Sequence, residues 1–331
     1  MGQAPRSRWH ALDPEGLLEA DRLSALASLH RVRGANELAQ TLHEQALAIR
    51  EQALGPDHPE VAGSLASLAN VFRAVHDYPR ARTLHERALA IREGALGPAH
   101  PEVASSLGNL GVVFAETGDH ARARELFERA LAIGEGAHGP HHVRLVGTLY
   151  NLAAACAATR DFSAARAHFE RALAILEATH GPRDPSVAAA LINVAKVHNS
   201  TGEQDRAIPL YERAIEIQRA TLGPEDPEVA ASLWGLARVY LTGGETTQAV
   251  RTLERAVAIY DRHDGEQAGE LDARFALAKA LITSSGDRAK AHALALQARD
   301  GWRAAGEGRA AELAAIEQWL RTEGDVTAAQ Q

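Results

Sequence analysis

Three asparagines recur at intervals of 42 residues, at Asn109, Asn151 and Asn193. An asparagine amide can donate a hydrogen bond to a carbonyl and accept one from an N–H group at the same time. Each of the three falls in the middle of a predicted helix, where asparagine is less favourable than alanine by about 0.6 kcal/mol. A binding role would explain this cost, and inheritance by duplicated segments would explain the recurrence equally well. Ser67 and Gly235 interrupt the series on either side.

Large apolar residues directly precede this position in three segments, at Tyr150, Ile192 and Trp234. We expect them to lie beside the asparagines on one helix face and to contact the side chains of a ligand. Lys196 and Arg238 fall on the same face and make its later part basic, which favours an acidic ligand. Cover by a neighbouring helix is the alternative for the apolar residues, and simple hydration is the alternative for the charges.

Signatures of catalytic and cofactor sites are absent from the sequence. It has no glycine-rich phosphate loop, no Gly-x-Ser-x-Gly and no His-Glu-x-x-His. His58, His100 and His142 recur one repeat apart, which indicates a periodic surface feature. His138, His141 and His142 form a tight cluster, for which adventitious metal binding is a better interpretation than a physiological metal site. Cys156, the single cysteine, replaces aromatic residues of the sister segments, which indicates a core position rather than a nucleophile. The sequence therefore predicts a protein that is not an enzyme and has no catalytic residue, metal or cofactor.

A repeat of 42 residues positions all these side chains. Leu191, Val194, Ala195 and His198 lie on one face of a 3.6-residue period, and a second such set follows in the same repeat. This pattern predicts two helices per repeat, joined by a tight turn. Prolines at four repeat entries mark helix starts, because the first helical turn needs no amide donor. The repeats are separated by Gly-Pro pairs that begin at Gly55, Gly97, Gly139, Gly181 and Gly223.

The pattern predicts an all-α fold, an α-solenoid of about seven helix-turn-helix units. A capping helix is expected at residues 304–321, and residues 1–17 and 322–331 are expected to be tails. The terminal units depart from the repeat, which is typical of caps whose outer face meets water. The units are expected at residues 18–53, 60–95, 102–137, 144–179, 186–221, 228–261 and 270–303.

The small residues at the predicted helix contacts, the central turns such as Thr201-Gly202-Glu203, and the aromatics Phe127, Phe169 and Tyr211 resemble the tetratricopeptide repeat. The 42-residue period, with Leu-Gly-Pro-Asp-His-Pro-Glu-Val-Ala at residues 54–62, is similar to the kinesin light chain variety. In such proteins the matching asparagine often hydrogen-bonds the backbone of an extended peptide. The resemblance therefore implies that the repeated asparagines hold the backbone of a bound peptide.

The composition excludes several classes of protein. The chain has 35 Lys and Arg against 43 Asp and Glu and a formal net charge of −8, which argues against a nucleic-acid partner. A single cysteine excludes an intramolecular disulfide framework. No apolar run follows Arg6 and Arg8, so we expect no signal peptide, and no stretch is long enough to span a membrane. We therefore expect a cytoplasmic protein that does not bind membranes.

The main functional hypothesis is a scaffold for protein–protein interaction that holds a protein or peptide partner in a concave groove. A resemblance to the repeat regions of some bacterial serine/threonine kinases gives a second hypothesis, a regulatory or sensor array that acts with a kinase or another signalling partner. A third is self-assembly into a homo-oligomer, in which one end of the stack docks on another copy. The predicted groove residues are Asn109, Tyr150, Asn151, Ile192, Asn193, Lys196, Trp234 and Arg238.

Overall fold

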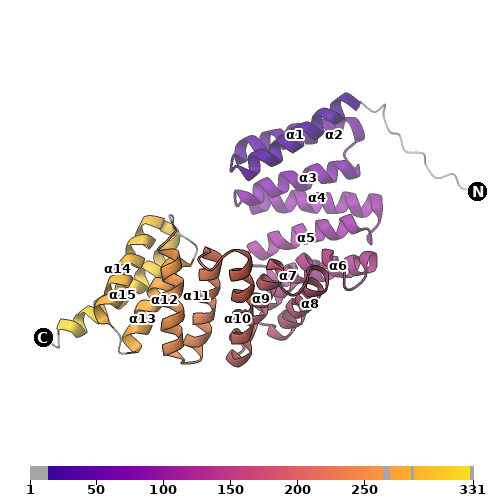
Figure 1. Cartoon of the computed structure of the whole chain (residues 1–331). Coiled ribbons are helices and arrows are strands. Elements are labelled where there is room, and N and C mark those ends of the chain that lie inside the picture. Colours follow the sequence, from indigo (N-terminus) through magenta and orange to yellow (C-terminus); the bar gives the residue numbers. More distant parts are fainter. Residues whose placement is uncertain (1–13, 264–268, 285–286, 329–331) are drawn as a thin grey trace, which may run out of the picture. The chain divides into compact units, whose positions relative to one another are not determined.

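The computed structural model describes residues 14–263, 269–284 and 287–328. Within them the chain forms fifteen α-helices and two short 3-10 helices, and no strand (Figure 1). The all-α fold predicted from the repeat is therefore confirmed. None of these helices is both long and apolar enough to cross a membrane.

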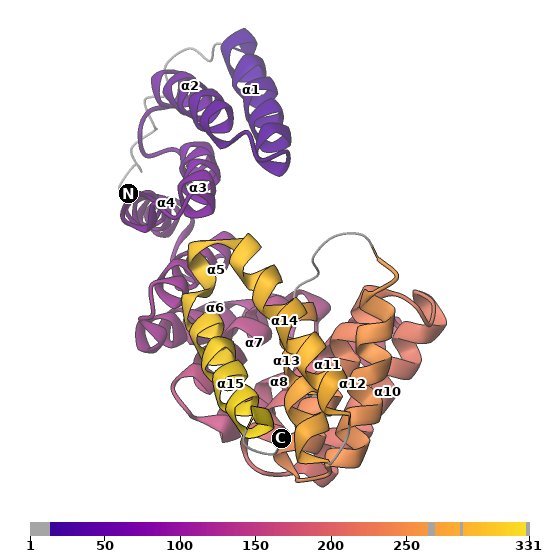
Figure 2. The ribbon, with the colours of Figure 1, turned by 90° about the vertical axis from the view of Figure 1, so that its left-hand side faces the viewer.

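The helices form two compact units, which divide inside α8 (Phe162–His180), between His168 and Phe169. In each unit, consecutive helices pack together as pairs, and the second helix of a pair also packs on the first helix of the next (Figures 1 and 2). The first unit contains α1 (Pro14–Val32), α2 (Asn36–Leu54), α3 (Pro59–Ala74), α4 (Tyr78–Leu96), α5 (Pro101–Glu116), α6 (His120–His138), the 3-10 helix η1 (Val143–Leu145) and α7 (Val146–Ala158). The second contains α9 (Pro185–Ser200), α10 (Gln204–Thr221), α11 (Pro227–Thr242), α12 (Thr246–Tyr260), α13 (Glu270–Thr283), α14 (Arg288–Ala305), the 3-10 helix η2 (Glu307–Arg309) and α15 (Ala310–Ala328).

The loop between repeats sets the helix boundaries. Helices α3, α5, α9 and α11 each begin with a proline, as the sequence predicts. Asp184 and Asp226 cap two of them by accepting backbone N–H bonds of 2.9 and 2.8 Å. His58 and His100 do the same through Nδ1, at 3.2 Å, so a histidine ring replaces the carboxylate in the first unit. The preceding helix ends at a glycine such as Gly55, whose φ of 88° carries little cost only for glycine.

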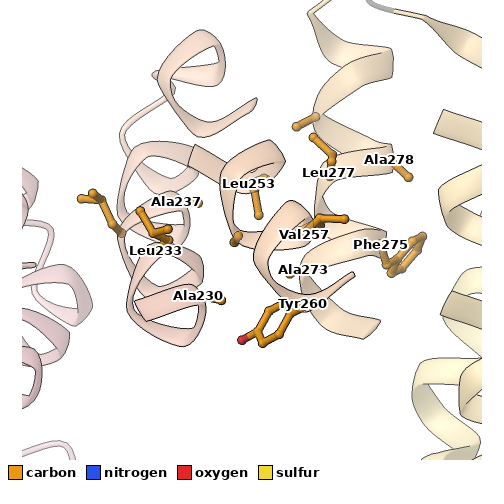
Figure 3. Packing of buried hydrophobic residues seen from close by; sticks show 14 of the residues in the cluster. Ala230, Leu233, Ala237, Leu253, Val257, Tyr260, Ala273, Phe275, Leu277 and Ala278 are labelled. Carbon is orange, nitrogen blue, oxygen red and sulfur yellow. The ribbon is translucent and has the colours of Figure 1, made fainter. Parts of the chain in front are cut away.

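Small residues lie where helices contact each other. Ala237 in α11 is fully buried in the core of the second unit, where Leu253 and other large side chains fill the space around it (Figure 3). Ala256 in α12 is fully buried in the same core. In the repeat that contains α5, the position of Ala237 is occupied by Gly111. A Cβ atom at Gly111 would lie 2.6 Å from Cε1 of Phe127, which is closer than two non-bonded carbon atoms approach in folded proteins. Different repeats therefore fill equivalent contacts with different pairs of side chains.

Helix α15 closes the C-terminal end, and the predicted capping helix is confirmed. Its Ile316 is fully buried, and Trp319 meets Phe275 edge to face with ring centroids 5.8 Å apart. Its boundaries differ from the expected 304–321. Helix α14 continues to residue 305 before Gly306 breaks it with a φ of 87°, so α15 begins at Ala310 and extends into the expected tail.

The N-terminal helix also begins earlier than expected. Helix α1 starts at Pro14, inside the predicted tail of residues 1–17, because proline is well suited to a first helical turn. Residues 1–13 and 329–331 of the two expected tails lie outside the described residues.

Candidate peptide-binding hollows

The first unit contains a hollow of about 370 Å³ between α5 and α7, bordered also by α6, which we call the α5–α7 hollow. Asn109 and Asn151 line it from equivalent positions of the two helices. Asn109 is half-buried and Asn151 is exposed, and neither side chain hydrogen-bonds to a described residue. Gly108 and Gly147 line the same hollow and leave open space beside their Cα atoms. Both amides are therefore available to a ligand.

Tyr150, expected beside these asparagines, is not among the residues that line the α5–α7 hollow. Its side chain is half-buried and its hydroxyl oxygen is shielded from solvent. Burial raises the pKa of this phenol above its ordinary value. A role for Tyr150 in contacting a ligand stays a prediction.

The second unit contains a hollow of about 460 Å³ between α9 and α11, bordered also by α10, which we call the α9–α11 hollow. It brings together five of the eight predicted residues. Ile192 and Trp234 supply apolar surface, and Asn193 supplies an amide that hydrogen-bonds to no described residue. Lys196 and Arg238 complete the set. One residue of the asparagine series, two of the apolar series and both basic residues therefore line one cavity.

The charges of the α9–α11 hollow are not balanced. Neither Lys196 nor Arg238 forms an ion pair with a described residue, and the one carboxylate among the lining residues belongs to Glu228. Burial, and secondarily the positive charge of Arg238, lowers the pKa of Lys196. The guanidinium carbon of Arg238 lies 5.8 Å from the ring centroid of Trp234, within range of a cation–π contact. The hollow thus offers two cations beside an aromatic surface.

Gln218 of α10 also lines this hollow, and the sequence reasoning missed it. The side chain is only 7% exposed, and its buried Oε1 has no hydrogen-bond partner among the described residues. A buried amide without a partner is costly, so a group that donates a hydrogen bond to it from the hollow would be stabilised. The sequence does contain a sign of this role, because Gln218 is polar where the repeats before and after have Leu176 and Tyr260.

The structure also explains why the asparagine series ends at Gly235. A Cβ atom there would lie 2.5 Å from Cε1 and 2.8 Å from the hydroxyl oxygen of Tyr211. An asparagine cannot occupy this position while the ring of Tyr211 stays in place, and the ring is almost fully buried. Burial also raises the pKa of this phenol to about 12, so it stays protonated and can donate a hydrogen bond. Tyr211 therefore presents a hydroxyl where sister repeats present an amide.

The remaining candidates have structural explanations. His142 caps η1, where its Nδ1 accepts the N–H of Arg144 at 3.2 Å, and its ring stacks near that of His138 with centroids 5.0 Å apart. Across the described ranges, no three His, Cys, Asp or Glu side chains gather as metal ligands would. Cys156 is fully buried in α7, as predicted, and burial raises the pKa of its thiol.

Comparison with known proteins identifies the repeat. A family model described as the tetratricopeptide repeat matches residues 19–93, 60–136, 113–178, 144–220 and 186–262. The chain belongs to the tetratricopeptide repeat family. No curated protein matches this tetratricopeptide repeat chain in sequence.

Solved structures support the assignment. Nearly identical TPR-like repeats attributed to a Podosopora anserina kinesin light chain superpose with a TM-score of 0.58 at 28% identity, covering 63% of this chain and 99% of the other. BtubC (BKLC) from P. vanneervenii gives a TM-score of 0.57 at 21% identity, covering 76% and 92%. A tetratricopeptide repeat protein from Parabacteroides merdae gives 0.61 at 15% identity, covering 92% and 99%. The first match supports the kinesin light chain-like character of the repeats, and the other two show the fold.

Proposed function

We propose that this tetratricopeptide repeat protein is a non-enzymatic scaffold in the cytoplasm. It binds an acidic segment of a partner protein along the first helix of each repeat. Tetratricopeptide repeats generally mediate protein–protein interaction. The observation that carries the proposal is the α9–α11 hollow, in which Lys196 and Arg238 have no ion-pair partner among the described residues and lie beside Ile192 and Trp234.

The chemistry of this hollow defines the segment it would accept. A carboxylate near Lys196 and Arg238 would form charge-assisted hydrogen bonds, which are stronger than neutral ones. An aliphatic or aromatic side chain would pack on Ile192 and Trp234. The amide of Asn193 would hold the peptide backbone by donating one hydrogen bond and accepting another. In the first unit, Asn109 and Asn151 would make the same backbone contact in the α5–α7 hollow.

A random-peptide display selection on the full-length chain tests this proposal. We expect enriched peptides to carry an Asp or Glu near an apolar residue. Replacing Lys196 and Arg238 together with Ala should weaken their binding by at least about tenfold, because two charge-assisted contacts are lost. The Asn151→Ala/Asn193→Ala variant should also weaken binding without changing helix content. Lys290→Ala is the matched control, since Lys290 pairs with Glu254 at 2.7 Å and lies outside both hollows.

Peptides that bind both groove variants as well as they bind the unmodified chain would contradict the proposal. A regulatory array that acts with a kinase is the alternative, and it predicts a stable complex with a folded kinase but no enrichment of short peptides. Co-purification with a kinase distinguishes the two.

A further inference from the structure

Large exposed apolar side chains gather at the N-terminal end of the chain. Leu18 is 70% exposed and Val32 is 76% exposed, both on α1. Of seven large apolar side chains that are strongly exposed among the described residues, five belong to α1 and α2. These five are Leu18, Leu26, Leu29, Val32 and Leu38.

Three of the four exposed large apolar residues of α1 lie on the face opposite its packing face. Helix α1 packs on α2 and buries Ala20 and Ala27 completely. Because successive helical residues are rotated by about 100°, Leu18 and Leu29 point away from that contact, and Arg22 and Ala25 lie between them on the same face. The side chain of Arg22 is 80% exposed and pairs with Glu19 at 3.4 Å. We call Leu18, Ala25, Leu29 and Val32 the outer stripe of α1. No described residue covers it, whereas α15 covers the C-terminal end of the second unit.

The charges of α1 are arranged asymmetrically along its axis. Glu15, Glu19 and Asp21 lie in its first half, and Arg31 and Arg33 lie at its end. Arg22 is the one cation in the acidic half, and it pairs with Glu19. Glu15, Arg31 and Arg33 form no ion pair with a described residue. If two copies of α1 cross in antiparallel fashion near Ala25, Leu18 of one copy meets Leu29 and Val32 of the other, and Glu15 meets Arg33. A parallel pairing would instead place like charges opposite each other.

We propose that the outer stripe of α1 binds the same stripe of a second copy of this chain, forming a two-fold symmetric dimer through antiparallel α1 helices. The small side chain of Ala25 at the crossing point lets the helices approach closely. Since each copy uses the same patch, the contact closes on itself and gives a dimer rather than a filament. A helix of 19 residues is about 28 Å long. An interface of this length is small, so a dissociation constant on the order of 10 µM is expected.

Sedimentation equilibrium of the full chain, from low micromolar to several hundred micromolar, tests the proposal. The unmodified chain should pass from monomer to dimer, and Leu18→Glu/Leu29→Glu should weaken dimerisation by more than about a hundredfold, since four buried leucines are lost per dimer. Val75→Glu/Leu222→Glu is the matched control, because both residues are exposed apolar side chains that do not belong to α1, and it should dimerise normally. Circular dichroism should show the same helix content for all variants.

Charge reversal tests the antiparallel arrangement independently of the leucines. Glu15→Arg and Arg33→Glu should each weaken dimerisation by roughly tenfold, because each dimer exchanges two attractive contacts for two repulsive ones. An equimolar mixture of these two variants should dimerise as well as the unmodified chain does, because both contacts are again complementary. The double variant Glu15→Arg/Arg33→Glu should also recover.

Three results would overturn the proposal. A chain that stays monomeric at the highest concentration would mean that a different partner or another segment of the chain covers the stripe. A mass that grows beyond the dimer would exclude the closed two-fold contact. Failure of the mixture to recover would exclude the antiparallel pairing. None of these results bears on peptide binding in the two hollows, because no residue of α1 lines either of them.

Discussion

For the substitution Gly111→Ala, the repeat pattern and the structure predict changes in stability of opposite sign. Sister repeats carry alanine at this position, at Ala69, Ala153, Ala195 and Ala237. Alanine is also the better helix former by about 1 kcal/mol. The repeat pattern alone therefore favours Gly111→Ala as a stabilising change. In the structure, however, the added Cβ would lie 2.6 Å from Cε1 of Phe127.

The structure gives the magnitude. Phe127 is 1% exposed, so its ring can move only by displacing the packed side chains around it. Overpacking of this kind costs about 1–3 kcal/mol, which offsets the gain of about 1 kcal/mol in helix propensity. We expect Gly111→Ala to destabilise the protein by about 1 kcal/mol. Phe127→Leu shortens the ring side chain, and in that background Gly111→Ala should stabilise by about the full propensity gain.

Guanidinium unfolding followed by circular dichroism measures this double-mutant cycle, and Gly147→Ala is the control. Gly147 is an exposed residue of α7, and no atom lies within 4 Å of its added Cβ. The Gly147→Ala substitution should stabilise the protein by about 0.5–1 kcal/mol. In a chain that keeps Phe127, Gly111→Ala should not raise the unfolding midpoint as much as Gly147→Ala does. An equal increase would show that residue 111 is not closely packed against Phe127.

Two further changes test burial and capping. Burial, and secondarily the charges of Arg73 and Arg92, lowers the pKa of His85 to about 4, below its ordinary value of about 6.5. As the pH drops, the unfolded chain therefore binds the proton before the folded chain does. The unfolding free energy should fall by up to about 3 kcal/mol between pH 6.5 and pH 4. His85→Phe should flatten this part of the stability profile, as measured by unfolding at pH 7 and pH 5, and an unchanged slope would contradict the burial argument. Asp226→Ala removes the carboxylate that accepts the N–H of residue 228, and should lower the unfolding free energy by about 1 kcal/mol, whereas an unchanged midpoint would show that the cap is dispensable.

The helices and their order could be predicted from the sequence because their causes are local. A proline at the first position, an Asp or His cap and a terminal glycine act within one or two turns of the chain, so each repeat announces its own boundaries. The prediction was weakest at the ends, where the repeat pattern fades. There α1 began four residues early and α15 six residues late, because Pro14 and Gly306 set boundaries that no sister repeat reports.

The candidate site was predictable in part. The period placed Ile192, Asn193, Lys196, Trp234 and Arg238 on equivalent faces, and the structure brings all five to the α9–α11 hollow. Other contributions depend on contacts between residues far apart in the sequence. No local rule says that Gln218 of α10 reaches the hollow, or that Tyr150 does not line the α5–α7 hollow.

By itself, the sequence determined that the chain folds into repeated helix pairs with small residues at their contacts, because periodicity and capping are encoded within each repeat. Tertiary structure decided which pair of side chains fills the contact between the two helices of each repeat. Tyr211 excludes an asparagine at residue 235, and Phe127 requires a glycine at residue 111. The physical reason is that close packing is a property of pairs of side chains, so that the same position tolerates different residues according to what lies across from it.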